Sequence, residues 1–179
     1  MNFVQPVISV QKADQIFSKK RRFFHRSSGE IVRLELIHFP YYTFELRAST
    51  KKGEQKTSVA VDGIKGSFAF LELEEVVLSG EGRPSFGFVL SPKEAEKIAK
   101  DKYRGIILES GLQAKAPAEL KEIKKSMEIY YPYWICYYKK GDLYNFSVLD
   151  AVSGKIQGVK MNPVFLQAFN QQKVKNVES

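Results

Sequence analysis

Few side chains in this sequence are suited to catalysis. The single cysteine, Cys136, could act as a nucleophile, and the two histidines, His25 and His38, could bind a metal or transfer a proton. No histidine lies near Cys136 in the sequence, and neither histidine has nearby carboxylates at the spacing of a metal site. The acidic residues form no recognised acid–base pair, and the sequence has no glycine-rich phosphate loop or hydrolase elbow. We therefore expect a protein that is not an enzyme, uses no cofactor or metal, and buries Cys136 as a packing residue.

Four basic residues could instead contact an anion. Lys20 and Arg22 lie in the C-terminal half of one expected helix, and Lys102 and Arg104 occupy the matching positions of a second. Cations near a helix C-terminus are stabilised by the helix dipole, and lysine stems can cover apolar surface, so an ordinary solvated helix also explains this pattern. The net charge of +8 favours acidic partners such as nucleic acid. Both interpretations stay open at this point.

Aromatic residues are concentrated in two expected strands, at 30–48 and 122–138, on both sides of a proline. Because side chains alternate along a strand, one face of each strand packs against a helix and the other needs a separate cover. A second part of the molecule or a partner could provide it, and exposed aromatic patches commonly mark protein interfaces. The candidate binding residues on this second face are Phe39, Tyr41, Tyr131, Tyr133 and Tyr137.

An internal repeat predicts the elements that position these residues. Three segments recur in the same order: a helix start at 9–16 and 91–98, an aromatic–proline strand at 37–42 and 129–134, and an Asp-x-x-x-Gly turn at 62–66 and 150–154. Ser9 and Ser91 suit helix N-caps, and Asp62 and Asp150 suit the first position of a tight turn. The sequence therefore predicts an α+β fold made by tandem duplication of an α-β-β-β-β unit, each unit a helix packed on an antiparallel sheet.

The repeat also sets the expected boundaries along the chain. The segments are a first unit at 1–79, a linker and lead-in at 80–90, a second unit with a short C-terminal helix at 91–172, and a frayed tail at 173–179. In each unit the fourth strand is expected at 67–78 and near 155–161, respectively. The sequence does not decide whether the two sheets join edge to edge or stack face to face.

Part of the second unit resembles PepSY-type modules. The resemblance covers roughly 50 residues. It rests on three segments: Tyr131-Pro132-Tyr133-Trp134, the strand from Tyr144 to Leu149, and Asp150-Ala151-Val152-Ser153-Gly154-Lys155. In the first unit only the turn from Asp62 to Gly66 matches. The resemblance implies a small helix-plus-hairpin module that binds or regulates without catalysis, usually secreted or membrane-attached. The present sequence departs from that setting because its first residues are not those of a signal peptide.

Composition and candidate residues together predict a binding protein. The sequence is 44% hydrophobic and 13% aromatic, which is enough for a core, and it has no apolar run long enough to span a bilayer. We therefore expect a cytoplasmic location, or an extracytoplasmic one if a leader has been removed. The first hypothesis is a non-enzymatic binding or regulatory module that uses the aromatic sheet face to bind a protein or a second copy of itself. The alternative is a nucleic-acid-binding protein that uses the basic helix and exposed tyrosines. An enzyme would require an unforeseen cleft of Tyr, Lys and Glu residues.

Overall fold

The computed structural model describes residues 1–23, 29–71, 77–79, 82, 85–158 and 161–177, with the backbone alone at 20–23, 140 and 171–177. Within these ranges the chain is mixed α+β, with three helices and a seven-stranded sheet. The predicted α+β class is confirmed at this level. Among the described residues, no helix is long and apolar enough to cross a membrane.

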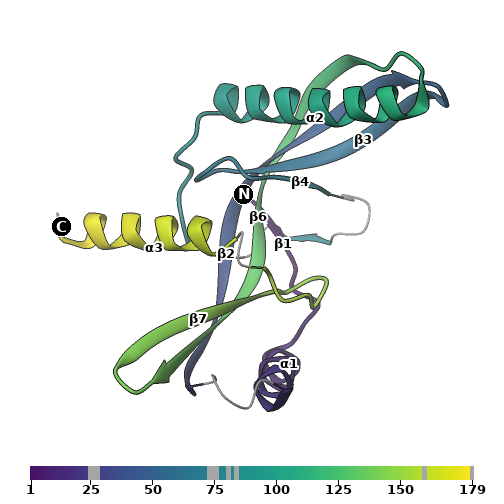
Figure 1. Cartoon of the computed structure of the whole chain (residues 1–179). Coiled ribbons are helices and arrows are strands. Elements are labelled where there is room, and N and C mark those ends of the chain that lie inside the picture. Colours follow the sequence, from purple (N-terminus) through teal and green to yellow (C-terminus); the bar gives the residue numbers. More distant parts are fainter. Residues whose placement is uncertain (24–28, 72–76, 80–81, 83–84, 159–160, 178–179) are drawn as a thin grey trace.

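Two long antiparallel strands form the spine of the sheet. Strands β2 (Glu30–Thr50) and β6 (Glu119–Lys140) pair along nearly their full lengths (Figure 1). Both are rich in β-branched and aromatic residues, which favour extended backbone. Near the middle of the pairing, Phe39 lies opposite Tyr131. The two predicted units therefore contribute to one continuous sheet, joined edge to edge rather than stacked.

Each long strand folds back into a hairpin at its C-terminal end. β2 continues into β3 (Gly53–Asp62), and β6 continues into β7 (Leu143–Asp150). Because β2 and β6 are antiparallel, the two hairpins lie at opposite ends of the sheet (Figure 1). The registers correspond: Tyr41 pairs with Asp62 in the first hairpin, and Tyr133 pairs with Asp150 in the second. The remaining short strands are β4 (Phe68–Phe70) beside β3, β1 (Asn2–Val4) beside β6, and β5 (Leu78–Ser79) beside β1.

The expected fourth strand of each unit differs from the structure. In the first unit, β4 ends at Phe70 and β5 begins at Leu78, and residues 72–76 of the expected strand lie outside the described residues. In the second unit, the described part of 155–161 makes a single bridge, between Leu149 and Ile156, and then leads into a helix. That helix, α3 (Asn162–Val177), extends beyond the end expected near residue 172.

Two helices cover one face of the sheet at its opposite ends. In α2 (Pro92–Ala114), Ser91 is the N-cap, as the sequence predicts; it forms a reciprocal capping box with Glu94, and Pro92 occupies the first turn. α1 (Val10–Phe23) begins after Ser9, whose hydroxyl accepts the Lys12 backbone N–H. Ala95, Ala99, Tyr103 and Ile107 of α2 form a cluster with residues of β2, β3 and the first half of β6, whereas Ala13 and Phe17 of α1 form one with residues of β6, β7 and the first part of β2.

Each helix packs with strands of its own predicted unit, as expected, and also with the hairpin of the other predicted unit. The segment before α1 docks on the second hairpin, because the Val7 and Ile8 N–H groups donate to the carbonyl of Ala151. The segment before α2 docks on the first hairpin, because the Val89 and Leu90 N–H groups donate to the carbonyl of Gly63. The lead-in segment of each helix therefore docks on the hairpin of the other predicted unit.

Candidate functional site

The predicted aromatic face is mostly part of the core. Phe39, Tyr41 and Tyr133 are buried, whereas Tyr131 and Tyr137 are half-buried. The cover is α3, whose Phe165 ring lies 5.1 Å from that of Phe39 and 5.2 Å from that of Tyr133. The central part of this face is therefore covered by α3 of the same chain. Of the five predicted residues, Tyr131 and Tyr137 keep some exposure to solvent.

A hydrogen bond joins the two long strands inside this core. The hydroxyl groups of Tyr41 and Tyr133 lie 2.9 Å apart. Burial raises the pKa of both hydroxyls, so both are neutral at physiological pH. Their contact satisfies two buried polar groups that would otherwise destabilise the fold. We therefore interpret this pair as structural.

The turn role predicted for the two aspartates is confirmed. Asp62 Oδ1 accepts the backbone N–H groups of Ile64 and Lys65, and Asp150 Oδ1 accepts those of Val152 and Ser153. The Tyr131 hydroxyl also donates to the Asp150 carboxylate, and burial is the main cause of its raised pKa. Both carboxylates are occupied by turn contacts, which leaves them poorly placed for acid–base chemistry.

The other catalytic candidates are also explained by packing. Cys136 is buried against α1, next to Phe17 and Leu149. The His38 ring packs edge-on against Phe3, with 5.3 Å between ring centroids, and His25 lies outside the described residues. Among the described residues, no group of three or more His, Cys, Asp or Glu side chains is arranged to hold a metal ion.

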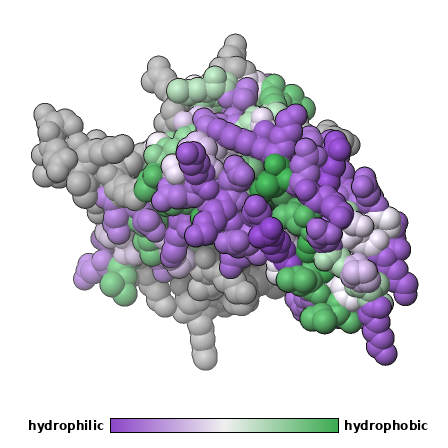
Figure 2. Space-filling model, turned by 90° about the horizontal axis from the view of Figure 1, so that it is seen from above, coloured by the Kyte–Doolittle hydropathy of each residue, from purple (hydrophilic) through white to green (hydrophobic). Residues whose placement is uncertain are grey.

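The predicted basic residues are only partly described. Lys102 and Arg104 are exposed on α2, whereas the side chains of Lys20 and Arg22 lie outside the described residues. Seen from above, the surface around α2 carries mostly hydrophilic residues with smaller groups of hydrophobic ones (Figure 2). Beside the end of α2, a depression of about 280 Å³ is lined by Lys51, Lys52, Ser110 and backbone near Gly111, with no carboxylate, histidine or tyrosine in its lining.

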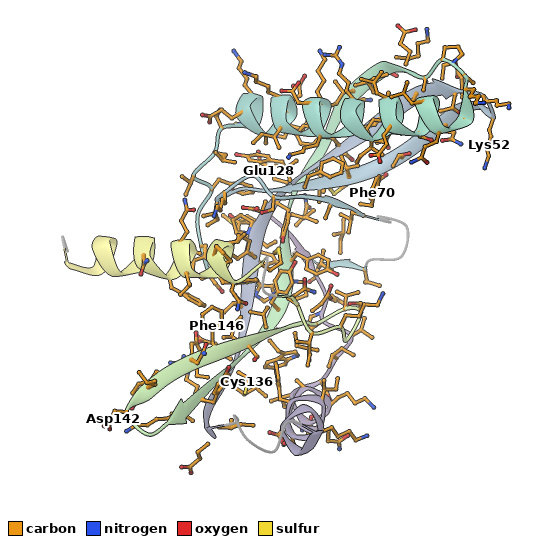
Figure 3. The ribbon with its side chains drawn as sticks, viewed as in Figure 1. Lys52, Phe70, Glu128, Cys136, Asp142 and Phe146 are labelled. Carbon is orange, nitrogen blue, oxygen red and sulfur yellow. The ribbon has the colours of Figure 1, made fainter. Side chains whose placement is uncertain are left out.

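A group of partly exposed aromatic side chains lies on the α3-facing side of the second hairpin, and a separate pair, Phe68 and Phe70 of β4, lies beside the first hairpin. We call the group on the second hairpin the aromatic surface, and it consists of Tyr137, Tyr144, Phe146 and Phe169. Phe146 points toward α3, whereas Cys136 lies on the α1 side of the same hairpin (Figure 3). The Phe169 ring lies 5.6 Å from that of Phe146 and 6.3 Å from that of Tyr137. Tyr144, nearer the hairpin tip, is 69% exposed.

Cations border the aromatic surface. The Lys139 ammonium lies 5.3 Å from the ring centroid of Tyr144, and the Arg33 guanidinium lies 6.0 Å from that of Tyr137. Arg33 also pairs with Glu35 at 2.8 Å. Burial, and then the neighbouring Glu35 carboxylate, raises the pKa of Tyr137 to about 12, so its hydroxyl stays protonated and can donate a hydrogen bond. The site combines apolar rings with hydrogen-bond donors and positive charge.

The first hairpin carries polar residues, one of them charged, at the corresponding positions. Lys56 and Ser58 precede Asp62 by the same numbers of residues as Tyr144 and Phe146 precede Asp150. Lys56 pairs with Glu45 across the strands at 3.1 Å. Farther along β2 on the same face, Arg47 and Glu122 form an exposed pair at 3.5 Å. The two hairpins therefore have matching backbones but different surfaces.

Sequence reasoning identified Tyr137 but missed the other members of the aromatic surface. Tyr144, Phe146 and Val148 alternate along β7, and this period-two pattern was a usable signal for a shared face. Phe169 required knowledge of where α3 packs, which no local pattern supplies. Comparisons with protein-family models, curated proteins and solved structures give no match to this chain.

Proposed function

We propose that this protein is a non-enzymatic binding or regulatory module that recognises a protein partner through the aromatic surface. The observation that carries the proposal is the contrast between two hairpins of matching register. One has charged side chains on the face opposite its helix, and the other has partly exposed aromatic rings there. Packing of the hairpin does not require Tyr144 to be aromatic, because most of its side chain faces solvent.

The chemistry of this surface suits recognition of a polypeptide. Tyrosine and phenylalanine supply large contact area with few rotatable bonds, and such residues are enriched in interfaces. The edge of the surface carries Lys139, which favours acidic groups on a partner, whereas Arg33 is already paired with Glu35. The surface contains no nucleophile and no pair of general acid and base. Binding is therefore the activity that this arrangement supports best.

A peptide selection with a matched control tests the proposal. A displayed library of random dodecapeptides would be selected on the full chain, and the enriched peptides would be measured on Tyr144→Lys and on Lys56→Ala. Tyr144→Lys places the side chain of the first hairpin at the exposed aromatic position, whereas Lys56→Ala alters the corresponding position of β3. We expect enriched peptides to lose at least tenfold in affinity on Tyr144→Lys, about 1.4 kcal/mol, and to bind Lys56→Ala normally. Equal binding to all three proteins would contradict the proposal.

The alternative function is nucleic-acid binding. It is favoured by the exposed Lys102 and Arg104 on α2 and by the net charge of +8. Phosphate contacts predict an affinity for single-stranded oligonucleotides that falls steeply with salt. Binding of a fluorescent thymidine oligonucleotide would be measured across a salt series with Lys102→Gln/Arg104→Gln as the variant. Absence of binding at about 50 mM salt, where phosphate contacts are strong, would exclude this alternative.

We also propose that the chain arose by tandem duplication of a helix-plus-hairpin unit. Two correspondences support this origin. Phe39 and Tyr131, which match in the sequence repeat, pair with each other in the sheet. The Tyr42 hydroxyl donates to the carbonyl of Leu90 before α2, just as the Trp134 indole N–H donates to that of Ile8 before α1.

The duplication has a direct test. If the two units descend from one, residues 85–179 expressed alone should dimerise, with β6 of each copy pairing around Tyr131 in place of the β2–β6 pairing. Light scattering would measure the mass. A folded monomer would count against the proposed origin.

A further inference from the structure

We propose that the outer edge of β7 accepts an extended segment of a partner polypeptide as an added strand, and that this segment carries apolar and acidic side chains on the face of the aromatic surface. The inference rests on the proposed function and specifies how the partner binds. Strand addition supplies backbone hydrogen bonds, and the flanking side chains supply selectivity.

The backbone of β7 shows which of its groups point outward. The Val148 carbonyl accepts a hydrogen bond from the N–H of Gln157. The Phe146 N–H donates to the side-chain Oδ1 of the preceding residue, Asn145, at 2.8 Å. Both groups therefore point away from β6. Because backbone direction alternates along a strand, the N–H and carbonyl of Tyr144 point outward as well. Among the described residues, no strand pairs with this edge between Tyr144 and Phe146.

The corresponding edge of β3 is covered or blocked. β4 pairs with Val59–Val61, and the Leu71 N–H continues this cover by donating to the Ser58 carbonyl. Beyond that point the β3 edge carries Lys56, a type of residue that discourages pairing with another chain. The β7 edge instead carries Leu143 and Tyr144, which are 77% and 69% exposed. Of the two hairpin edges, β7 is the one suited to accepting a strand.

Charge and contact area favour a peptide segment over a second copy of this chain. The open edge spans three residues, whereas a stable dimer interface buries roughly 1,200–2,000 Å² in total. Each copy also carries a net charge of +8, so two copies repel. A residue opposite Tyr144 on an added strand would lie near the Lys139 ammonium, which already sits 5.3 Å from the Tyr144 ring. An acidic side chain fits there, and an apolar one fits beside Phe146.

Asn145 occupies one of the hydrogen-bonding groups that a partner strand would need. Its side chain is exposed, so it can rotate into solvent without disturbing the core. An incoming carbonyl would then replace Asn145 Oδ1 as the acceptor of the Phe146 N–H. Asn145 therefore acts as an exchangeable cap on this edge while no partner is bound.

The experiment uses the full chain and a defined probe. The probe is a fluorescent, N-acetylated heptapeptide amide of sequence TVTETVT, which places valine, glutamate and valine on one face of a strand. Two further versions carry N-methyl groups, one on the even-numbered and one on the odd-numbered amides, because a strand directs these two sets of amides to opposite edges. We expect the unmodified peptide and one methylated version to bind, and the other methylated version to bind at least tenfold more weakly.

Three outcomes would overturn the inference. They are no binding of the unmodified peptide at millimolar concentration, equal binding of both methylated versions, or preferential binding of a thymidine oligonucleotide at this edge. Equal binding of the methylated versions, with affinity still lost on Tyr144→Lys, would leave the proposed function standing and reject strand addition alone. The failures of the two proposals are therefore distinguishable.

Variants sharpen the test. Asn145→Ala removes the competing acceptor, so we expect it to tighten peptide binding about two- to threefold. A TVTKTVT peptide should bind several-fold more weakly than TVTETVT because lysine would face Lys139. Lys56→Ala is the control variant, and it should bind the TVTETVT and TVTKTVT peptides with the same affinities as the unmodified chain. Weaker binding to Asn145→Ala, or tighter binding of the lysine peptide, would contradict the proposed geometry.

Discussion

The hairpins β2–β3 and β6–β7 have the same backbone plan and opposite surface chemistry. Each starts from a long strand with a proline, pairs a tyrosine with a turn aspartate, and packs one face against a helix. On the other face, the first hairpin carries ion pairs, whereas the second carries Tyr144 and Phe146. Because the backbones match, the fold does not explain the difference in side chains. This comparison identifies the surface of the second hairpin as the region to test for function.

The comparison also extends to the helix-facing sides. Phe44 lies beneath α2 in the first hairpin, and Cys136 occupies the matching position beneath α1 in the second. Both are buried. The first hairpin thus fills this position with a large ring and the second with a small side chain. We therefore expect this core position to contribute more to stability in the first hairpin than in the second.

The largest expected effect tests that core difference. Phe44→Ala should lower the free energy of unfolding by about 3–5 kcal/mol, because it removes a fully buried ring and leaves a cavity. Cys136→Ala removes one atom and should cost about 1 kcal/mol or less. Urea denaturation of both variants measures the contrast. Equal costs would show that the two helix-facing sides are packed equivalently.

A smaller effect is expected at the contact between the halves. Tyr41→Phe leaves the buried Tyr133 hydroxyl without its partner and should cost about 1–3 kcal/mol. Tyr133→Phe should behave similarly. The double variant should cost less than the sum of the two, because it leaves no hydroxyl unpaired. Additive costs in chemical denaturation would indicate that the hydroxyls do not interact.

The same tyrosines predict a loss of stability at alkaline pH. Burial raises their folded-state pKa above the ordinary value of 10.0. The unfolded state therefore releases these protons first as the pH rises, which favours unfolding. Their contribution is fully present below pH 10 and declines above it, as the pH rises toward the folded pKa. Tm measured from pH 8 to pH 11 should fall above pH 10, and less steeply in the double phenylalanine variant; equal slopes would contradict the assignment.

The smallest stability change is expected at the exposed edge. Tyr144→Lys should alter the free energy of unfolding by less than about 0.5 kcal/mol, because the side chain is largely solvated. Its effect should appear in peptide binding instead. Thermal denaturation measures the effect of the substitution on stability, and a binding assay on the same variant measures its effect on peptide affinity. A large loss of stability would mean that Tyr144 is needed for folding and would weaken its assignment to recognition.

Much of the local structure could be predicted from the sequence. Serine N-caps, Pro92 and the turn aspartates act through neighbouring backbone groups, so their roles are visible in a short stretch of residues. The α+β class followed from the alternating patterns. Cys136 is buried, as expected for a lone cysteine with no histidine nearby in the sequence.

The arrangement of these elements could not be predicted in the same way. The sequence left undecided what covers the aromatic face, because the C-terminal helix gives no local sign that Phe165 packs between Phe39 and Tyr133. The segment before α1 docks on the second hairpin through hydrogen bonds to Ala151, and the segment before α2 docks on the first hairpin through hydrogen bonds to Gly63. These bonds join distant parts of the chain, so no local pattern predicts them. Exposure of the β7 edge depends on how far a neighbouring segment extends, which is a tertiary property.

Amide hydrogen exchange tests the central claim most directly. Exchange rates would be measured by NMR for the full chain, free and saturated with TVTETVT. The account predicts slower exchange at the Tyr144 and Phe146 amides, which point outward on β7, with unchanged rates at Lys56 and Ser58 on β3. Binding that leaves the Tyr144 and Phe146 rates unchanged, or that slows exchange equally on both hairpins, would contradict recognition through the edge of the second hairpin.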